Sequence, residues 1–155
     1  MFHEVVDDVA DERGKATAAT GESQDVTAAE LRSAFAAALR EAAADAGRTR
    51  LTSDLGLDAA SADAALDGDI DEVTVADGAA VLALSDDRDA DVMVAELRDH
   101  LLMGMTTAVL DVDTIAAGID TDLTGQEVQQ ALEGRAAMTV GELAEIAALI
   151  ERRKR

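Results

Sequence analysis

Apolar residues recur every three or four positions through most of the chain, which is the spacing of one face of a helix. In the segment 27–46, for example, Leu31, Phe35 and Leu39 follow one another at this spacing. No segment alternates between apolar and polar residues as a half-buried strand does, and the chain contains no proline to interrupt a helix. The pattern therefore predicts an all-α fold.

Three threonines each precede an acidic residue by three positions, the spacing of an N-terminal helix cap. In such a cap the threonine oxygen accepts the backbone N–H of the acidic residue, whose side chain can bond the N–H of the threonine. An apolar-faced segment follows each pair, so three helices are predicted to begin directly after the threonines. The pairs are Thr27 with Glu30, Thr74 with Asp77, and Thr139 with Glu142.

The pattern also repeats within the chain. The tetrapeptide "AELR" ends at Arg32 and again at Arg98, and "ALDG" ending at Gly68 returns as "ALEG" ending at Gly134, both after 66 residues. Beyond that glycine the interval is 65, as between the two capping threonines Thr74 and Thr139, which indicates one extra loop residue in the first copy. A constant interval across several separate blocks predicts a tandem duplication.

Each copy is predicted to form a four-helix unit: a long first helix, a short second helix, a third helix that ends at the glycine, and a capped fourth helix. Glycine suits the third-helix stop because it adopts the left-handed conformation without a steric cost. The second helices are expected around Leu51–Leu55 and Val112–Ile119, and the third helices at Ala59–Asp67 and Gly125–Glu133.

The two units are expected at residues 27–87 and 91–150. Residues 1–26 are expected to be a mobile N-terminal segment and linker, since residues 11–26 have almost no large apolar side chain. Within this segment, four apolar residues at helical spacing predict a short amphipathic helix that either docks on the body or frays: Phe2, Val5, Val6 and Val9. Residues 151–155, "ERRKR", form a basic tail.

The second copy, "DTIAAGIDTDLTGQEVQQALEGRAAMTVGELAEIAALI", resembles a Cro/C1-type helix-turn-helix domain, and the first copy resembles it in a degenerate form. The whole chain, including "MFHEV" and "AELRDHLLMGMTTAVLDVDT", is similar to a haloarchaeal family of unknown function. The helix-turn-helix resemblance implies that the third helix of a unit reads DNA in the major groove. The resemblance to the haloarchaeal family implies no activity.

The third helix of the first copy, "DAASADAAL", offers no Arg, Lys, Asn or Gln to a base edge, so this copy is not expected to read DNA. The second copy and the tail do offer candidate contacts to DNA or to a partner. The alternative, which we favour, is that the glutamines lie on a solvated helix face and that the basic tail stabilises a helix C-terminus. The candidates are Gln126, Gln129, Gln130, Arg135, Arg152, Arg153, Lys154 and Arg155.

Charge changes this picture, because 33 acidic residues against 13 Lys and Arg give a net charge of −20. Such a surface repels itself and the DNA backbone, and concentrated salt screens the repulsion. The composition indicates a protein of a high-salt cytoplasm; the alternatives are a nucleic-acid mimic and an acidic interaction tail. No signal sequence and no apolar run of about 18 residues is present, so a soluble, cytoplasmic protein that binds no membrane is expected.

Catalytic and metal-binding patterns are weak. The segment from Asp67, "DGDIDEVTVADG", places acids as a calcium loop does but has Glu72 and Gly78 where that loop needs glycine and glutamate. His3 lacks the second histidine of a zinc helix, and His100 corresponds to Ala34 of the first copy, so it is expected on a helix surface or packed. With no cysteine either, neither an enzyme nor a bound cofactor or metal is expected.

The segment 101–110, "LLMGMTTAVL", is the most apolar stretch and is apolar nearly all round. A helix of this kind is expected to be buried on every side. It would lie inside the chain, which we favour, or form the seam of a homodimer. Met103 and Met105 would also suit an adaptable protein-binding surface.

These observations predict a non-enzymatic regulatory or adaptor protein of unknown pathway, which acts through contacts with an unidentified protein partner. The alternative is a DNA-binding transcriptional regulator that uses the second unit and the basic tail, and DNA is not the favoured partner. A metal-dependent enzyme built on the acidic clusters ranks below both and would need His3 or His100 to meet carboxylates in a pocket.

Overall fold

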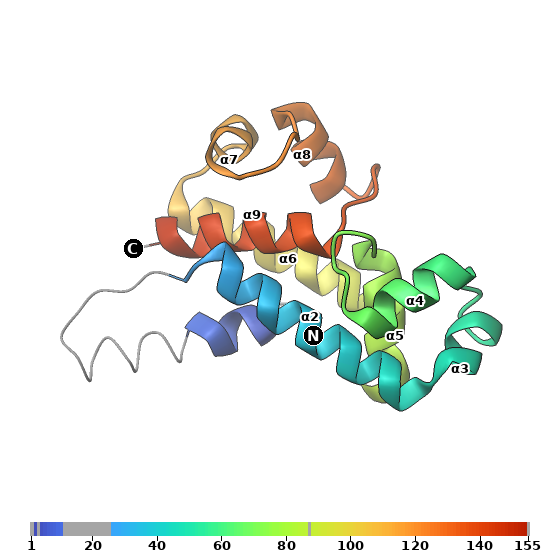
Figure 1. Cartoon of the computed structure of the whole chain (residues 1–155). Coiled ribbons are helices and arrows are strands. Elements are labelled where there is room, and N and C mark those ends of the chain that lie inside the picture. The colour runs from blue at the N-terminus through green and yellow to red at the C-terminus, as the bar shows by residue number, and fades with distance from the viewer. Residues whose placement is uncertain (1, 3, 11–25, 87, 155) are drawn as a thin grey trace, which may run out of the picture.

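The computed structural model describes residues 2, 4–10, 26–86 and 88–154. Every regular element within these residues is a helix, which confirms the prediction of an all-α fold (Figure 1). None of these helices combines the length and the apolar character that crossing a membrane alone would require. After an N-terminal helix at residues 4–10, the elements are α2 (Ala28–Ala46), α3 (Arg48–Ser53), α4 (Ala59–Asp67), α5 (Val75–Asp86), α6 (Ala90–Ala108), α7 (Val112–Gly118), α8 (Gly125–Leu132) and α9 (Val140–Arg153).

The predicted capping threonines begin their helices. The Thr27 and Thr139 side chains accept from the N–H of Glu30 and Glu142, and both glutamates bond back to the threonine N–H. Thr74 accepts from the Asp77 N–H (3.1 Å). These bonds join residues three positions apart, which explains why the sequence alone locates the helix starts.

The predicted short helices agree with the structure to within a few residues, but α3 runs from Arg48 to Ser53 rather than from Leu51 to Leu55. The reason is Gly47, which ends α2 with φ 82° and leads directly into the next helix. α4 has the predicted bounds, whereas α7 and α8 each end one residue earlier than predicted.

The four long helices form the centre of the molecule. α2 packs against both α5 and α9, and α6 also packs against both α5 and α9, so the first helix of each predicted unit contacts the last helix of both. The short pairs α3–α4 and α7–α8 lie at the periphery (Figure 1). Buried side chains from both units belong to one hydrophobic cluster. The two units therefore share a core.

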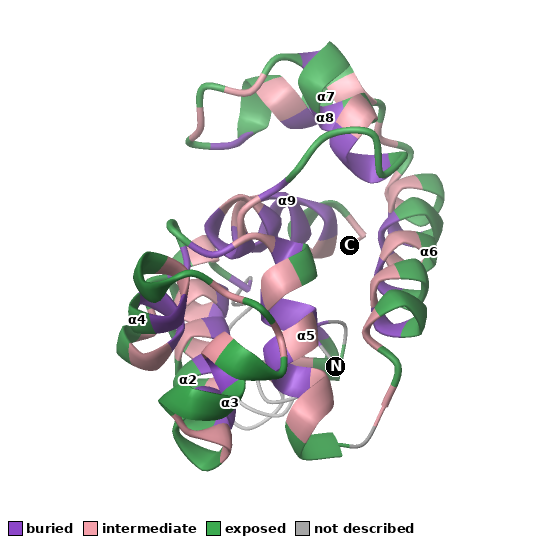
Figure 2. Cartoon of the chain, turned by 90° about the vertical axis from the view of Figure 1, so that its right-hand side faces the viewer, coloured by how far each residue is buried: buried purple, intermediate pink, exposed green. Residues whose placement is uncertain are grey.

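The prediction that residues 101–110 are buried on every side is wrong. Leu101 and Gly104 are buried, but Leu102 and Met103 are 46% and 71% exposed, and Val109 is 90% exposed. The helix buried nearly all round is α9, of which nine residues are buried. α6 lies at the edge of the molecule and turns only one face inward, as Figure 2 shows by its alternating colours. Composition identified an apolar helix, whereas its position in the fold decides which faces are covered.

The N-terminal helix docks on the body. Phe2 and Val6 are buried, and the Phe2 ring meets Phe35 of α2 edge to face, with 5.3 Å between centroids. An ion pair of 3.1 Å joins Glu4 to Arg88. The apolar spacing of this segment therefore marks a true helix face, and the rest of the predicted linker, residues 11–25, lies outside the described residues.

Candidate functional site

A groove runs along one face of α6, on the side of α7 and α8. Two adjoining hollows of about 530 and 510 Å³ share Leu102 and Met105 and so form one continuous surface. We call this surface the α6 groove. It is lined by Ala95, Arg98, Asp99, Leu102, Met105, Thr106 and Val109 of α6 and its end, by Leu110, Asp111 and Val112, and by Gln129, Leu132 and Glu133 of α8 and its end.

The groove lies where α8 packs less closely on α6 than α4 packs on α2. α4 packs closely on α2, where a Cβ at Gly68 would lie 3.0 Å from the Ala36 carbonyl oxygen, whereas α8 makes few contacts with α6. The residue 66 positions after Ala36 is Leu102. Leu102 has a larger side chain than Ala36, and it lines the open groove.

Val109 ends α6 in an unusual way. Its backbone has φ 56° and ψ 51°, and it is the one residue other than glycine with a positive φ among those described. This left-handed conformation is a genuine outlier for a β-branched residue. As a result, α6 stops at the groove and presents an apolar side chain to solvent there.

The rim of the groove is mainly negative. It carries Asp99, Asp111 and Glu133 against Arg98, while Arg135 pairs with Glu133 from outside the groove. The Thr114 backbone N–H lowers the pKa of Asp111, and hydrogen bonds from Gln129 and then Arg135 lower the pKa of Glu133. Both carboxylates are thus held in their charged form, and the groove offers an anionic edge around an apolar floor.

The candidate contacts on α8 are exposed but partly engaged. Gln126 and Gln129 are exposed and Gln130 is half-buried. Gln129 Nε2 donates to Glu133 Oε1 (3.0 Å), and Arg135 pairs with the other oxygen of Glu133. Gln129 also lines the α6 groove. One carboxylate therefore holds two of the four side chains that would have to reach a base.

The basic tail lies away from this group. Arg152 and Arg153 are exposed at the end of α9, Lys154 pairs with Glu151 (2.8 Å), and Arg155 lies outside the described residues. Arg135 precedes α9, whose 14 residues span about 20 Å. The described part of the basic tail therefore lies at the opposite end of α9 from Arg135.

A family model described as a family of unknown function (DUF5791) matches residues 31–153. The chain belongs to this family. The match begins within α2 and ends within α9, so it spans both predicted units. No curated protein and no solved structure matches the chain significantly.

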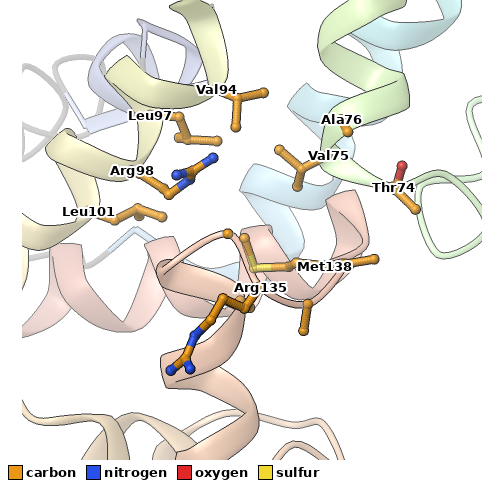
Figure 3. Close-up of a pocket in the computed structure, with 13 residues that line it drawn as sticks. Thr74, Val75, Ala76, Val94, Leu97, Arg98, Leu101, Arg135 and Met138 are labelled. Carbon is orange, nitrogen blue, oxygen red and sulfur yellow. The ribbon is translucent and has the colours of Figure 1, made fainter. Parts of the chain in front are cut away.

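A smaller pocket of this DUF5791 chain, of about 250 Å³, lies where the two units meet. Its walls are α6, the start of α5 and the loop before α9. Figure 3 shows the Arg98 side chain directed into the space between α6 and α5, whereas Arg135 extends away from it. Arg98 was not among the predicted site residues, although it ends the second of the repeated "AELR" stretches.

His100 lies near two carboxylates, as the enzyme hypothesis requires, but it lines none of the pockets described above. Its Nε2 lies 3.7 Å from Asp7 Oδ1, and one ligand atom each of Asp7, His100 and Glu151 lie within 4.8 Å of one another. Lys154 Nζ already occupies Glu151 Oε1 at 2.8 Å. A divalent ion at this cluster would compete with that ammonium group, and the three side chains lie where the N-terminal helix meets α6 and α9.

Proposed function

We propose that this DUF5791 protein is a non-enzymatic regulatory or adaptor module that binds a partner protein in the α6 groove. The observation that carries the proposal is the apolar face that α6 turns to solvent. Leu102 and Val109 line a groove there and are 46% and 90% exposed. Contiguous apolar surface in a groove is typical of a site that receives side chains of another molecule.

The shape of the groove supports an amphipathic helix as its occupant. The α6 side chains that line it recur at positions 95, 98, 102, 105 and 109, so the groove follows the helix axis for about four turns. A partner helix would place apolar residues at three- and four-residue spacing into such a groove. Met105 supplies an adaptable floor for them.

Charge supports a basic partner. The rim carries Asp99, Asp111 and Glu133, and the chain as a whole has a net charge of −20. Lysines and arginines beside the apolar face of the partner would be attracted, whereas an acidic helix, including a second copy of this chain, would be repelled. The acidic composition also supports a working environment of concentrated salt, such as a halophilic cytoplasm.

The alternative, DNA binding through the second unit, has less support. Glu133 engages Gln129 and Arg135, and the basic tail lies at the other end of α9 from Arg135, a helix about 20 Å long. Since neutralisation of phosphates dominates affinity for DNA, a strongly acidic chain whose basic groups are separated from one another is poorly suited to bind DNA.

The test is selection from a displayed library of amphipathic helical peptides whose polar faces are either basic or acidic, at the lowest KCl concentration that keeps the chain folded, because concentrated salt would screen the charge preference. We expect basic peptides to be enriched by the wild type and lost with Leu102→Asp. The matched control is Val92→Asp, which places the same charge on the same helix at a valine that is 51% exposed and outside the groove. Equal enrichment by the wild type and Leu102→Asp would reject the groove as the site.

Two measurements separate the alternatives. Sedimentation of the wild type and of Leu102→Asp would show a dimer lost on mutation if a second copy occupied the groove. Selection from random DNA duplexes, with a Gln129→Ala, Gln130→Ala and Arg135→Ala triple variant, would show enrichment lost in that variant if the chain read DNA. Either result would overturn the proposal that a basic partner helix is the ligand of this chain.

A further inference from the structure

The two arginines that end the repeated "AELR" stretches, Arg32 and Arg98, have different surroundings. Arg32 Nη2 lies 2.6 Å from Asp71 Oδ2, and its Nη1 lies 3.9 Å from Glu145 Oε1. Arg32 also donates to the Gly141 carbonyl oxygen at 3.4 Å. Two carboxylates of the chain itself therefore compensate its charge.

The positions that correspond to these partners are alanines around Arg98. The residue 65 positions after Asp71 is Ala136 and the next is Ala137, and the residue 65 positions before Glu145 is Ala80. Arg98 forms no ion pair with any residue that the structure describes. Of the described arginines without an ion pair, Arg98 is half-buried, whereas Arg40, Arg152 and Arg153 are exposed.

The pocket at the junction of the units lies where the counterpart of the Asp71 carboxylate is missing. Ala76, Ala136 and Ala137 line it together with Arg98. The residue corresponding to Ala76 is Gly141, where a Cβ would collide with the Asp71 carboxylate beside Arg32. The first unit thus fills this place with an ion pair, and the second unit leaves it open.

We propose that this pocket binds a small organic acid, whose carboxylate replaces the missing internal partner of Arg98. The inference does not rest on the proposed function. A half-buried guanidinium with its planar fork of donors is the side chain best suited to hold a carboxylate by two hydrogen bonds. Thr74, at the start of α5, offers a hydroxyl in the same pocket.

The rest of the lining selects for an apolar body on the acid. Val75, Val94, Leu97, Leu101 and Met138 form the wall opposite and around Arg98. A doubly charged phosphate would meet one arginine and a strongly acidic surface, and would leave charge uncompensated. A monocarboxylate needs only that one cation, and burial of its hydrocarbon adds to the affinity.

The experiment titrates the isotope-labelled full chain with hexanoate and, separately, with 1-hexanol, in KCl of fixed concentration, followed by amide shifts. We expect hexanoate to shift the amides of residues 131–138 and of Leu101 saturably, and hexanol to bind at least about tenfold more weakly, since it cannot form the charge-assisted hydrogen bonds. Equal affinities for hexanoate and hexanol would show that the pocket is only an apolar cavity, and would overturn the proposal. Absence of a saturable shift with acetate, hexanoate and benzoate would also overturn it.

Four variants assign the effect to Arg98. Arg98→Met should abolish hexanoate binding. Ala136→Asp and Ala137→Asp, at exposed loop positions, restore the internal carboxylate found beside Arg32 and should each weaken binding at least about tenfold with the fold intact. The matched control is Arg135→Met, because Arg135 lines the pocket but pairs with Glu133 and points away. If hexanoate still bound to Arg98→Met and to both aspartate variants, the assignment to Arg98 would be overturned. If hexanoate bound equally well to Leu102→Asp and to the wild type, this pocket would be a site separate from the α6 groove.

Discussion

Thr74 and Thr139, which stand 65 residues apart, lie opposite each other in an antiparallel bridge. The Val75 N–H donates to the Met138 carbonyl oxygen at 2.8 Å, and the Val140 N–H donates to the Val73 carbonyl oxygen at 2.9 Å. Each threonine also caps the helix that follows it. The starts of α5 and α9 are therefore held together by corresponding residues of the two predicted units.

Because its hydroxyl satisfies a backbone N–H at the start of the most buried helix, Thr139 should matter for stability. We expect Thr139→Ala to reduce the free energy of unfolding by about 1 kcal/mol in urea at fixed KCl. The control is Thr107→Ala, an exposed site whose hydroxyl bonds only the Met103 carbonyl oxygen within its own helix. Equal losses in the two variants would contradict the role assigned to the cap.

The left-handed backbone of Val109 should make this residue a source of strain. We expect Val109→Gly to raise the free energy of unfolding by about 0.5–1 kcal/mol, since relief of the steric cost outweighs the entropy of glycine. Met103→Gly, at an exposed position inside the same helix, should instead lower it by roughly 0.5–1 kcal/mol. Urea unfolding of both variants checks the opposite signs, and a loss in Val109→Gly would rule out strain.

Docking of the N-terminal helix should depend on Phe2, which is 2% exposed and stacks edge to face on Phe35. We expect Phe2→Ala to lower the free energy of unfolding by about 3 kcal/mol, the usual loss when a buried phenylalanine is replaced by alanine. Phe2→Leu keeps most of the apolar volume and should cost clearly less. Hydrogen exchange of residues 4–10 should accelerate in Phe2→Ala; unchanged exchange there would mean that the ring does not hold this helix.

Asp58 and Asp111 cap α4 and α7, and backbone N–H groups of Ser61 and Thr114 lower their pKa values. A group whose pKa is lower in the folded state stabilises the fold above its ordinary pKa and loses that contribution as the pH falls through the lowered value. Acidification below about pH 4 should therefore weaken both caps. Asp111→Asn keeps a capping oxygen that does not titrate, so its Tm should fall less than that of the wild type between about pH 6 and pH 3. If the Tm of the wild type and that of Asp111→Asn fell by the same amount over this pH range, the role assigned to the Asp111 carboxylate would be contradicted.

The net charge of −20 should make stability depend on salt. The Debye length falls from about 10 Å at 0.1 M to about 3 Å at 1 M salt, which removes most repulsion between carboxylates. We expect the Tm to rise steeply with KCl up to about 1 M and then level off. A rise that continued linearly at higher concentration would instead indicate exclusion of salt from the protein surface.

The candidate site was only partly visible in the sequence. Gln129 was a candidate contact and does line the α6 groove, and Met105 was noted as an adaptable residue. Leu102 was taken for a buried residue, although a signal for its exposure existed: it stands where the first copy has Ala36, in a helix that packs closely. The duplication itself stays a prediction, as do the partner and the high-salt environment.

What the sequence determined by itself is the set of helices and most of their ends. Thr139 with Glu142, and Gly68 at the end of α4, act through hydrogen bonds and backbone angles within a few residues, so their effects can be derived locally. Tertiary structure alone decided which face of α6 is open and why Arg32 is paired but Arg98 is not. Those outcomes depend on Asp71, Glu145 and other side chains far along the chain, and on which helices approach closely enough to exclude water.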